Sequence, residues 1–226
     1  TAVDTEHHLI VAHEVTNVGN DTAHLANMAA QAKAALAVDQ LAVVADRGYF
    51  DTDEIVACTK AGVTVTLPRR MTSNAKAEGR FGKQDFAYLA GEDAYRCPAG
   101  EKLTYRYTNS ERGQTLRRYW TNACGDCALK DLCTTGKERR IARSENEPIL
   151  EAVQERLDGN PQAMRTRRET VEHPFGTIKA RMGATHFQMR TLPKVATEMA
   201  LAVLAYNLTR VMKIMGVKPL IAAMRG

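Results

Sequence analysis

The first 67 residues alternate between short β-branched runs and amphipathic segments, and this alternation restricts the chain to a few folds. The expected elements are a β-hairpin at 2–18, a helix at 22–38, a strand at 41–45, a helix at 52–60 and a strand at 63–67. Asp4–His8 would form the polar turn of the hairpin. The order strand, strand, helix, strand, helix, strand predicts a mixed α/β sheet.

Three polar clusters are expected to set the ends of these helices. Asn20-Asp21-Thr22 precedes the first apolar helical residue and predicts an N-cap. Asp51 with Glu54 resembles a capping box for the second helix, and Gly62 follows its last turn.

The pattern changes after residue 68. Residues 69–90 are polar, and residues 93–121 predict short hairpins with turns at Gly100 and Asn109–Gly113. Helical periodicity returns at 147–158, 162–182 and 192–215. We therefore expect three segments: 1–68, the first part of an α/β domain; 69–146, a β-rich insertion containing cysteines; and 147–226, the helical remainder of that domain.

Charge and composition favour a polyanionic partner. Lys and Arg number 31 against 26 Asp and Glu, a formal charge of +5, and the pI is about 9.0. Aromatic residues make up only 6%, which argues against stacking platforms for single-stranded nucleic acid. No apolar run approaches the roughly 20 residues of a membrane span, and the first residues do not resemble a signal peptide.

Asp46 follows the predicted strand 41–45 directly. The carboxyl edge of such a sheet is where α/β proteins usually bind ligands, and Gly48 lets the backbone turn sharply there. Two interpretations stay open: a metal-binding carboxylate, or an ordinary aspartate at the end of a strand.

A second motif lies in the predicted helix 162–182. Arg168, Glu172 and Lys179 fall on one helical stripe. The stripe suits a metal-binding carboxylate flanked by phosphate-binding cations, or else a solvated salt-bridged face. Because Pro174 removes a backbone donor, either the helix kinks there or Glu172 lies in its first turn.

Four of the five cysteines follow the pattern C-x26-C-x2-C-x5-C, at Cys97, Cys124, Cys127 and Cys133. A C-x2-C pair with two further thiolates favours a structural Zn²⁺ site. Free thiols and two disulfides are the alternatives. Cys58 lies on the predicted helix 52–60 and is expected to be a lone core thiol.

Together the two carboxylate motifs, Asp46-x-Gly48-Tyr49 and Arg168-x3-Glu172-x6-Lys179, resemble the DDE transposases of bacterial insertion sequences. The resemblance implies a ribonuclease-H-like mixed sheet with flanking helices, in which Asp46 and Glu172 are catalytic and hold Mg²⁺ or Mn²⁺. Arg168 and Lys179 would bind phosphates, with Arg47 and His173 as further candidates; a packing role is the alternative for His173. The family commonly has a Tyr where this chain has Arg165.

The implied function is metal-dependent cleavage and strand transfer of double-stranded DNA, at transposon ends and target. The implied setting is the bacterial cytoplasm at the nucleoid, with a homo-oligomer as the active form and no membrane. The first catalytic Asp of that fold is expected ahead of Thr1, since Asp4 fits a turn, and the chain alone is then expected to be inactive. Two alternatives are a catalytically incomplete, DNA-binding or domesticated remnant, and a cysteine-cluster interaction module.

Overall fold

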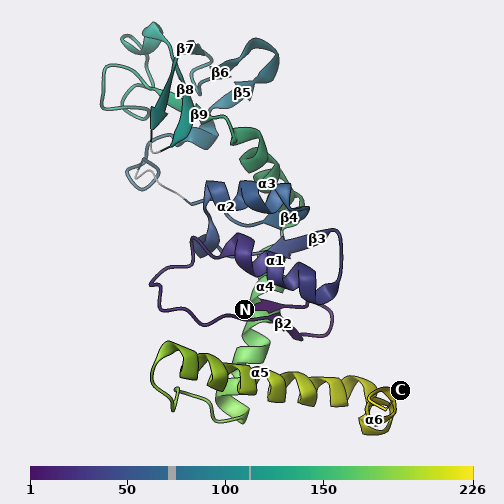
Figure 1. Cartoon of the computed structure of the whole chain (residues 1–226). Coiled ribbons are helices and arrows are strands. Elements are labelled where there is room, and N and C mark those ends of the chain that lie inside the picture. Colours follow the sequence, from purple (N-terminus) through teal and green to yellow (C-terminus); the bar gives the residue numbers. More distant parts are fainter. Residues whose placement is uncertain (71–74, 112, 226) are drawn as a thin grey trace. The chain divides into compact units, whose positions relative to one another are not determined.

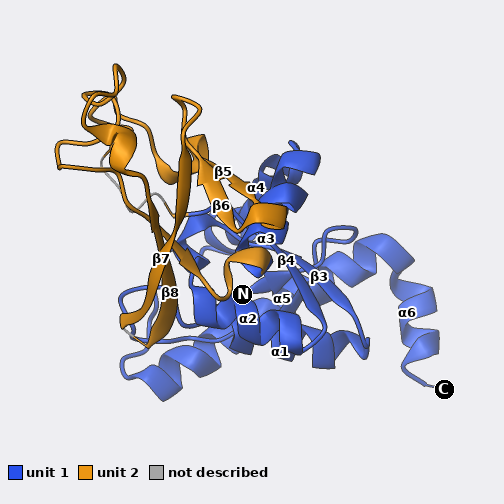
Figure 2. Cartoon of the chain, turned by 90° about the horizontal axis from the view of Figure 1, so that it is seen from above, with its two compact units in different colours: residues 1–69, 149–226 blue, residues 70–148 orange. Residues whose placement is uncertain are grey.

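The structure is a computed structural model that describes residues 1–70, 75–111 and 113–225. The chain forms two compact units (Figure 2). Unit 1 combines residues 1–69 with 149–226, and unit 2 consists of residues 70–148. The predicted mixture of helices and strands is confirmed.

Unit 1 follows the predicted order of elements (Figure 1). Its elements are β1 (Ala2–Val3), β2 (Ile10–Ala12), α1 (Leu25–Leu36), β3 (Leu41–Val44), the short 3₁₀ helix η1 (Arg47–Tyr49), α2 (Thr52–Lys60), β4 (Val63–Thr66), α3 (Glu147–Gly159), α4 (Ala163–Gly176), the π-helix η5 (Thr177–Arg181), α5 (Leu192–Met215) and α6 (Val217–Ala223). The predicted hairpin ends earlier than expected, at Ala12, and α6 was not predicted.

The strands of unit 1 form two separate pairs. β1 and β2 are antiparallel, whereas β3 and β4 are parallel, in register from Leu41 opposite Val63 to Val44 opposite Thr66. The expectation of one mixed sheet is therefore wrong for the described residues, in which no ladder joins the two pairs. Helix α4 contacts both β1 and β3.

The main core of unit 1 lies where α1, α2, β4 and α3 meet. Ile55 and Leu67 are fully buried there, and Cys58 is 1% exposed, which confirms its prediction as a core thiol. Arg156 of α3 donates from Nε and Nη2 to the carbonyl of Val65, at 3.0 and 2.9 Å. The guanidinium therefore satisfies a backbone acceptor of β4.

A second apolar cluster holds α5 against the first hairpin. Ile10 packs with Ile178, Val203 and Tyr206. Asn207 makes two hydrogen bonds with the backbone of Ile10. In the described part of the chain no single helix is long and apolar enough to cross a membrane; α5 and α6 pass that test only as a pair, bent by 109°.

The N-terminal cap of α1 differs from its prediction. The residue at the cap position is His24, whose side chain makes no capping hydrogen bond, so the assignment of Asp21 to this role is wrong. Asp51 caps α2 as predicted, accepting from the amides of Asp53 and Glu54. The Glu54 carboxylate does not complete a capping box, because it accepts from the Ala26 amide in the first turn of α1, at 2.8 Å.

Unit 2 is built on one curled antiparallel sheet with the strand order β5-β6-β7-β8-β9. The strands are β5 (Ala87–Leu89), β6 (Ala94–Arg96), β7 (Lys102–Glu111), β8 (Gln114–Trp120) and β9 (Ile141–Ser144), accompanied by the short 3₁₀ helices η2 (Lys83–Asp85), η3 (Ala90–Glu92) and η4 (Asn122–Cys124). β5 and β9 were not predicted. The turn at Gly100 is confirmed, whereas the second predicted turn includes Arg112, which lies outside the described residues.

The core of unit 2 is rich in aromatic side chains. Tyr119 is fully buried and packs with Tyr95, Leu103, Phe86 and Ile141. The hydroxyl of Tyr119 donates to Asp93 at 2.7 Å, which keeps this polar tip satisfied inside the core. Unit 2 also contains an ion pair between the partly exposed Lys83 and the buried Glu147, with N and O 2.7 Å apart.

Candidate functional site

Asp46 lies two positions beyond Val44, the last residue of β3, and caps η1. Its Oδ1 accepts from the Gly48 amide at 2.8 Å. A Cβ atom added to Gly48 would lie 2.9 Å from that same oxygen, closer than real contacts allow. Glycine at this position therefore lets the carboxylate fold back over the turn, which explains the Asp-x-Gly spacing physically.

The other oxygen of Asp46 is bound by a residue that the sequence analysis did not single out. Arg167 of α4 donates from Nη2 to Asp46 Oδ2 at 2.8 Å, across 121 positions of the chain. The Asp46 side chain is 39% exposed, so the carboxylate is also accessible to solvent. No local signal predicts this pair, because Arg167 is one of four arginines between positions 165 and 181 that point in different directions.

A second carboxylate borders the same place. The Cβ position on Gly48 lies 3.8 Å from Asp21 Oδ2, so Asp21 and Asp46 approach one point from two sides. Burial raises the pKa of the nearby Tyr49 hydroxyl, the charges of Asp21 and Asp46 raise it further, and Arg167 opposes them. Asp21 is thus a neighbour of the candidate site and not a helix cap.

The α4–η5 segment presents the predicted stripe to solvent. Arg168, Glu172 and Lys179 are all exposed. Within residues 1–70, 75–111 and 113–225, none of the three forms a hydrogen bond or an ion pair, although Arg168 and Glu172 are spaced for one. The salt-bridged-face interpretation is therefore wrong for these three side chains, whose charges are free to bind a ligand.

The structure excludes one of the two alternatives raised by Pro174, namely that Glu172 lies in the first turn of its helix. Glu172 lies well inside α4, not in its first turn, and Pro174 is buried within the helix. The helix continues as the π-helix η5, which carries Lys179. Five residues along an α-helix correspond to a rotation of about 140°, so Arg167 and Glu172 leave α4 on different sides.

The two further candidates for phosphate binding, Arg47 and His173, differ in their surroundings. Arg47 is exposed and has no ion-pair partner among the described residues. His173 stacks on His8, with ring centroids 4.9 Å apart, and its Nδ1 lies 3.0 Å from the Tyr206 hydroxyl. Because that hydroxyl donates to the His8 carbonyl at 2.6 Å, it accepts from His173 Nδ1–H. His173 thus has a packing role in this structure.

Burial lowers the pKa of His173, and the nearby His8 lowers it further, followed by three cations. The cations are Arg210, Arg181 and Lys213. A neutral imidazole with Nδ1–H committed to Tyr206 leaves only an acceptor at Nε2. Such a ring offers no proton to a phosphate unless it becomes charged.

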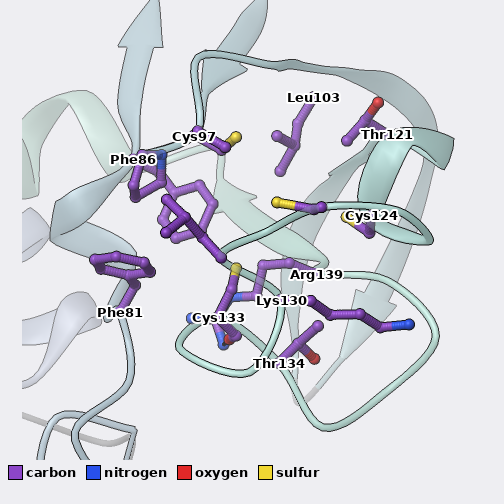
Figure 3. A pocket seen from close by; sticks show the side chains of 14 residues that line it. Phe81, Phe86, Cys97, Leu103, Thr121, Cys124, Lys130, Cys133, Thr134 and Arg139 are labelled. Atoms are coloured by element: carbon purple, nitrogen blue, oxygen red, sulfur yellow. Dashed lines mark hydrogen bonds between the residues drawn. The ribbon is translucent and has the colours of Figure 1, made fainter.

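The four cysteines of the predicted zinc site line one small cavity in unit 2, of about 20 Å³ (Figure 3). Their thiols are free, and so is that of Cys58, so the alternative of two disulfides is wrong. Phe81, Phe86 and Leu103 supply apolar walls. A cavity of this size holds about one water-sized particle.

The electrostatics of this cavity depend on the cysteines and one arginine. Burial raises the pKa of Cys133, the Arg139 guanidinium lowers it, and the other three cysteines of the cluster raise it. Arg139 Nε is buried without a hydrogen-bond partner. In the described part of the chain, however, no three His, Cys, Asp or Glu side chains are already arranged as metal ligands.

Comparison with known proteins gives a match, which covers the cysteine cluster and the Arg168–Lys179 stripe. Residues 96–212 match the family described as Transposase DDE domain. The match includes the four clustered cysteines, Arg168, Glu172 and Lys179, whereas Asp46 lies outside it. No curated protein and no solved structure matches the chain. Since the match covers more than half of the 226 residues, the chain belongs to the family of transposase DDE domains, whose members cleave and join DNA with divalent metal ions.

Proposed function

We propose that this chain is the DNA-handling part of an insertion-sequence transposase, with a catalytic centre built from Asp46 and Glu172. The observation that carries the proposal is the unpaired stripe Arg168, Glu172 and Lys179, which lies inside the family match. Because these three charges are exposed and unpaired, a ligand can bind them without first breaking an ion pair. DNA phosphates and a divalent cation are ligands of that chemistry.

The proposed reaction is hydrolysis of a DNA phosphodiester at a transposon end, followed by attack of the freed 3′-hydroxyl on target DNA. In the first step a water oxygen bonds to phosphorus and the 3′-oxygen leaves; in the second the 3′-oxygen bonds to a target phosphorus and displaces another 3′-oxygen. Bound Mg²⁺ or Mn²⁺ supplies Lewis-acid stabilisation of the attacking and leaving oxygens. Arg168, Lys179 and Arg47 hold phosphates, which fixes the strand in register without reading bases.

The chain's own geometry sets what Asp46 must do. Its Oδ1 is held by the Gly48 amide and its Oδ2 by Arg167, so metal binding competes with the guanidinium for Oδ2. Arg167 and Glu172 leave α4 on different sides, so a metal ion held by both Asp46 and Glu172 would require the two carboxylates to approach each other.

The proposed architecture is the ribonuclease-H-like domain of 1–68 and 147–226, interrupted by the insertion 69–146. The parallel β3–β4 pair and the helix order support it. Asp46 and Glu172 supply only two of the three carboxylates that the resemblance implies, so we expect residues 1–226 to bind duplex DNA without cutting it. The active form in this proposal is a homo-oligomer at the bacterial nucleoid.

Duplex binding tests the stripe. Arg168→Ala and Lys179→Ala should each weaken binding of a 30-base-pair duplex and reduce the slope of log K against log salt by about 0.9. Lys60→Ala, which removes an exposed cation on α2, is the matched control and should leave the slope unchanged. Equal effects of all three variants would show that the stripe is not where DNA binds.

Plasmid nicking in Mn²⁺ tests the carboxylates. The unmodified chain should leave supercoiled plasmid intact. Nicking by the unmodified chain that disappears in both Asp46→Asn and Glu172→Gln would show that both carboxylates are needed and that the proposed incompleteness is wrong. Restored nicking in a longer chain, abolished by either substitution, would support the assignment of both residues.

The cysteine cavity belongs to the same proposal as a structural zinc site. Cys97, Cys124, Cys127 and Cys133 would be its ligands, since four thiolates are the donor set that tetrahedral Zn²⁺ prefers. The unpartnered Nε of Arg139 suits a zinc–thiolate site, because its N–H can donate a hydrogen bond to a thiolate sulfur and stabilise the negative charge there. Zinc here would stabilise the insertion and take no part in the DNA chemistry.

Metal analysis tests the zinc proposal without any activity assay. Purified protein should contain close to one zinc per chain, and a Co²⁺-substituted sample should show the visible absorption of a tetrahedral thiolate site. Cys124→Ser should lose the metal, whereas Cys58→Ala, in the core of unit 1, should retain it. Equal zinc content in the two variants would contradict the proposed ligands.

A further inference from the structure

The aromatic residues of this chain are concentrated in unit 2. It contains the only Trp and five of the seven Tyr, and 15 Lys and Arg against 11 Asp and Glu, which is most of the chain's positive excess. The low overall aromatic content therefore conceals a local enrichment. An aromatic surface flanked by cations is typical of proteins that bind unpaired nucleic acid strands.

Trp120 lies on the outer face of the five-stranded sheet. Because side chains alternate along a strand, Trp120 points away from the core that buries its neighbour Tyr119. Tyr107 packs edge-on against it, with ring centroids 5.8 Å apart at 74°, and Tyr107 is 44% exposed. The two rings therefore form a shelf with accessible aromatic surface.

The guanidinium groups of two arginines lie over the Trp120 ring. The guanidinium carbon of Arg106, on β7, lies 5.4 Å from the ring centroid, and that of Arg140, just before β9, lies 4.9 Å away. We call Arg106, Tyr107, Trp120 and Arg140 the Trp120 row. Rings and guanidinium planes are the groups on which unstacked bases rest, and guanidinium N–H groups bind phosphate.

The charges around the row are unequal. Arg140 pairs with Glu138, and the nearby Arg118 pairs with Glu111. Arg106 has no carboxylate partner in the described part of the chain, and its Nε makes only a long contact of 3.4 Å to the Trp120 carbonyl. A guanidinium without a carboxylate partner can bind a DNA phosphate, and an accessible aromatic ring beside it can stack against the neighbouring base.

We infer that the Trp120 row binds a single strand of DNA, with bases stacked on the exposed Tyr107 ring and on the guanidinium planes that cover Trp120, and a phosphate bound by the N–H groups of Arg106. The inference rests on the proposed function for the identity of the polymer, and adds a second surface to the α4–η5 stripe. Stacking needs an unpaired base, whereas the stripe needs only phosphates. The two surfaces should therefore respond to different forms of DNA.

The sole tryptophan makes the test direct, because fluorescence excited at the long-wavelength edge, where tyrosine does not absorb, reports on Trp120 alone. Oligo-dT of 20 nucleotides should quench it, and an abasic strand with the same number of phosphates should bind about tenfold more weakly. A duplex should leave the fluorescence unchanged. No quenching by oligo-dT, equal binding of the abasic strand, or equal quenching by the duplex would each overturn the inference.

Variants separate this surface from the stripe. Arg106→Gln and Tyr107→Leu should each weaken oligo-dT binding about fivefold to tenfold, measured by anisotropy of a labelled strand, with unchanged circular dichroism. Lys137→Gln, which removes an exposed cation of the same unit, should have no effect. If Lys137→Gln weakens oligo-dT binding as much as Arg106→Gln does, the binding depends only on the overall positive charge of unit 2, and the Trp120 row is not a specific site.

Arg168→Ala distinguishes failure of the two proposals. It should weaken duplex binding and leave the response of Trp120 to oligo-dT intact. If oligo-dT does not bind while duplex binding still depends on Arg168, the Trp120 row is not a single-strand site and the proposed function stands. If duplex binding is insensitive to Arg168 while oligo-dT quenches Trp120, the row stands and the catalytic stripe is wrong.

Discussion

The side-chain amide of Asn207 makes both hydrogen bonds of a strand partner to Ile10: Oδ1 accepts from the Ile10 amide at 3.0 Å, and Nδ2 donates to its carbonyl at 2.8 Å. A residue of α5 thus satisfies the backbone of β2 on the side that faces away from β1. Since Ile10 is 4% exposed, water cannot easily replace these bonds.

We therefore expect Asn207→Ala to lower the free energy of unfolding by about 2 kcal/mol, measured by urea denaturation. Asn207→Asp keeps the acceptor and loses the donor, so it should also destabilise the chain. Thr209→Ala, which removes an exposed hydroxyl two positions further along α5, should cost less than about 0.5 kcal/mol. Similar values for Asn207→Ala and Thr209→Ala would mean that the two bonds contribute no net stability.

Arg167→Gln should increase the affinity of the chain for Mn²⁺, because the guanidinium that competes for Asp46 Oδ2 is removed. Titration calorimetry measures this, and Asp46→Asn in the same background should abolish the gain. The loss in unfolding free energy should stay below about 1 kcal/mol, since the Asp46 side chain is 39% exposed. Unchanged Mn²⁺ affinity in Arg167→Gln would show that Asp46 is not a ligand.

Acidification should destabilise the contact between His173 and His8. Burial and the neighbouring positive groups lower the pKa of His173 below the ordinary 6.5. The unfolded chain then takes up this proton first, so stability is present above pH 6.5 and falls as the pH drops through the folded pKa. Thermal unfolding between pH 7 and 5 should show this loss, and His173→Gln should flatten it. A steeper loss in His173→Gln would contradict the expectation.

Cys58 should show the opposite pH dependence. Burial, followed by the charge of Glu54, raises the pKa of its thiol from 9.0 to about 11. The unfolded state ionises first, so this stability is present below pH 9 and is lost as the pH rises towards about 11. In native protein at pH 8, iodoacetamide should modify Cys58 last of the five cysteines, as followed by mass spectrometry. Early modification of Cys58 would contradict its burial.

Periodicity predicted most of unit 1, because each of those helices and strands buries one face. The limits of α5 agree with their prediction to the residue. The strands β5 and β9 were missed, since each is short and contributes only a few apolar residues between polar segments. Local patterns detect an element only where its own residues repeat at the required spacing.

Contacts between segments that are distant in the chain could not be predicted from local sequence patterns. Glu54 caps α1 through the amide of Ala26, which lies 28 positions earlier, and a local capping box at Asp51 was the natural expectation. The partnership of Asp46 with Arg167 depends on how α4 is rotated, which the spacing of its charges does not determine. The Asp-x-Gly motif and the pair Cys124-x2-Cys127 were recognisable because each depends on local geometry.

Unit 1 is built from two stretches that the ribosome delivers separately. Leu150 and Val153 of α3 complete the core around Ile55, and they follow residues 70–148 in the chain. At the usual 5–20 residues per second, synthesis of that intervening stretch takes about 4–16 s. During this time the nascent first half carries an uncovered apolar surface, which makes it a client for chaperones, while the insertion is free to fold before its host.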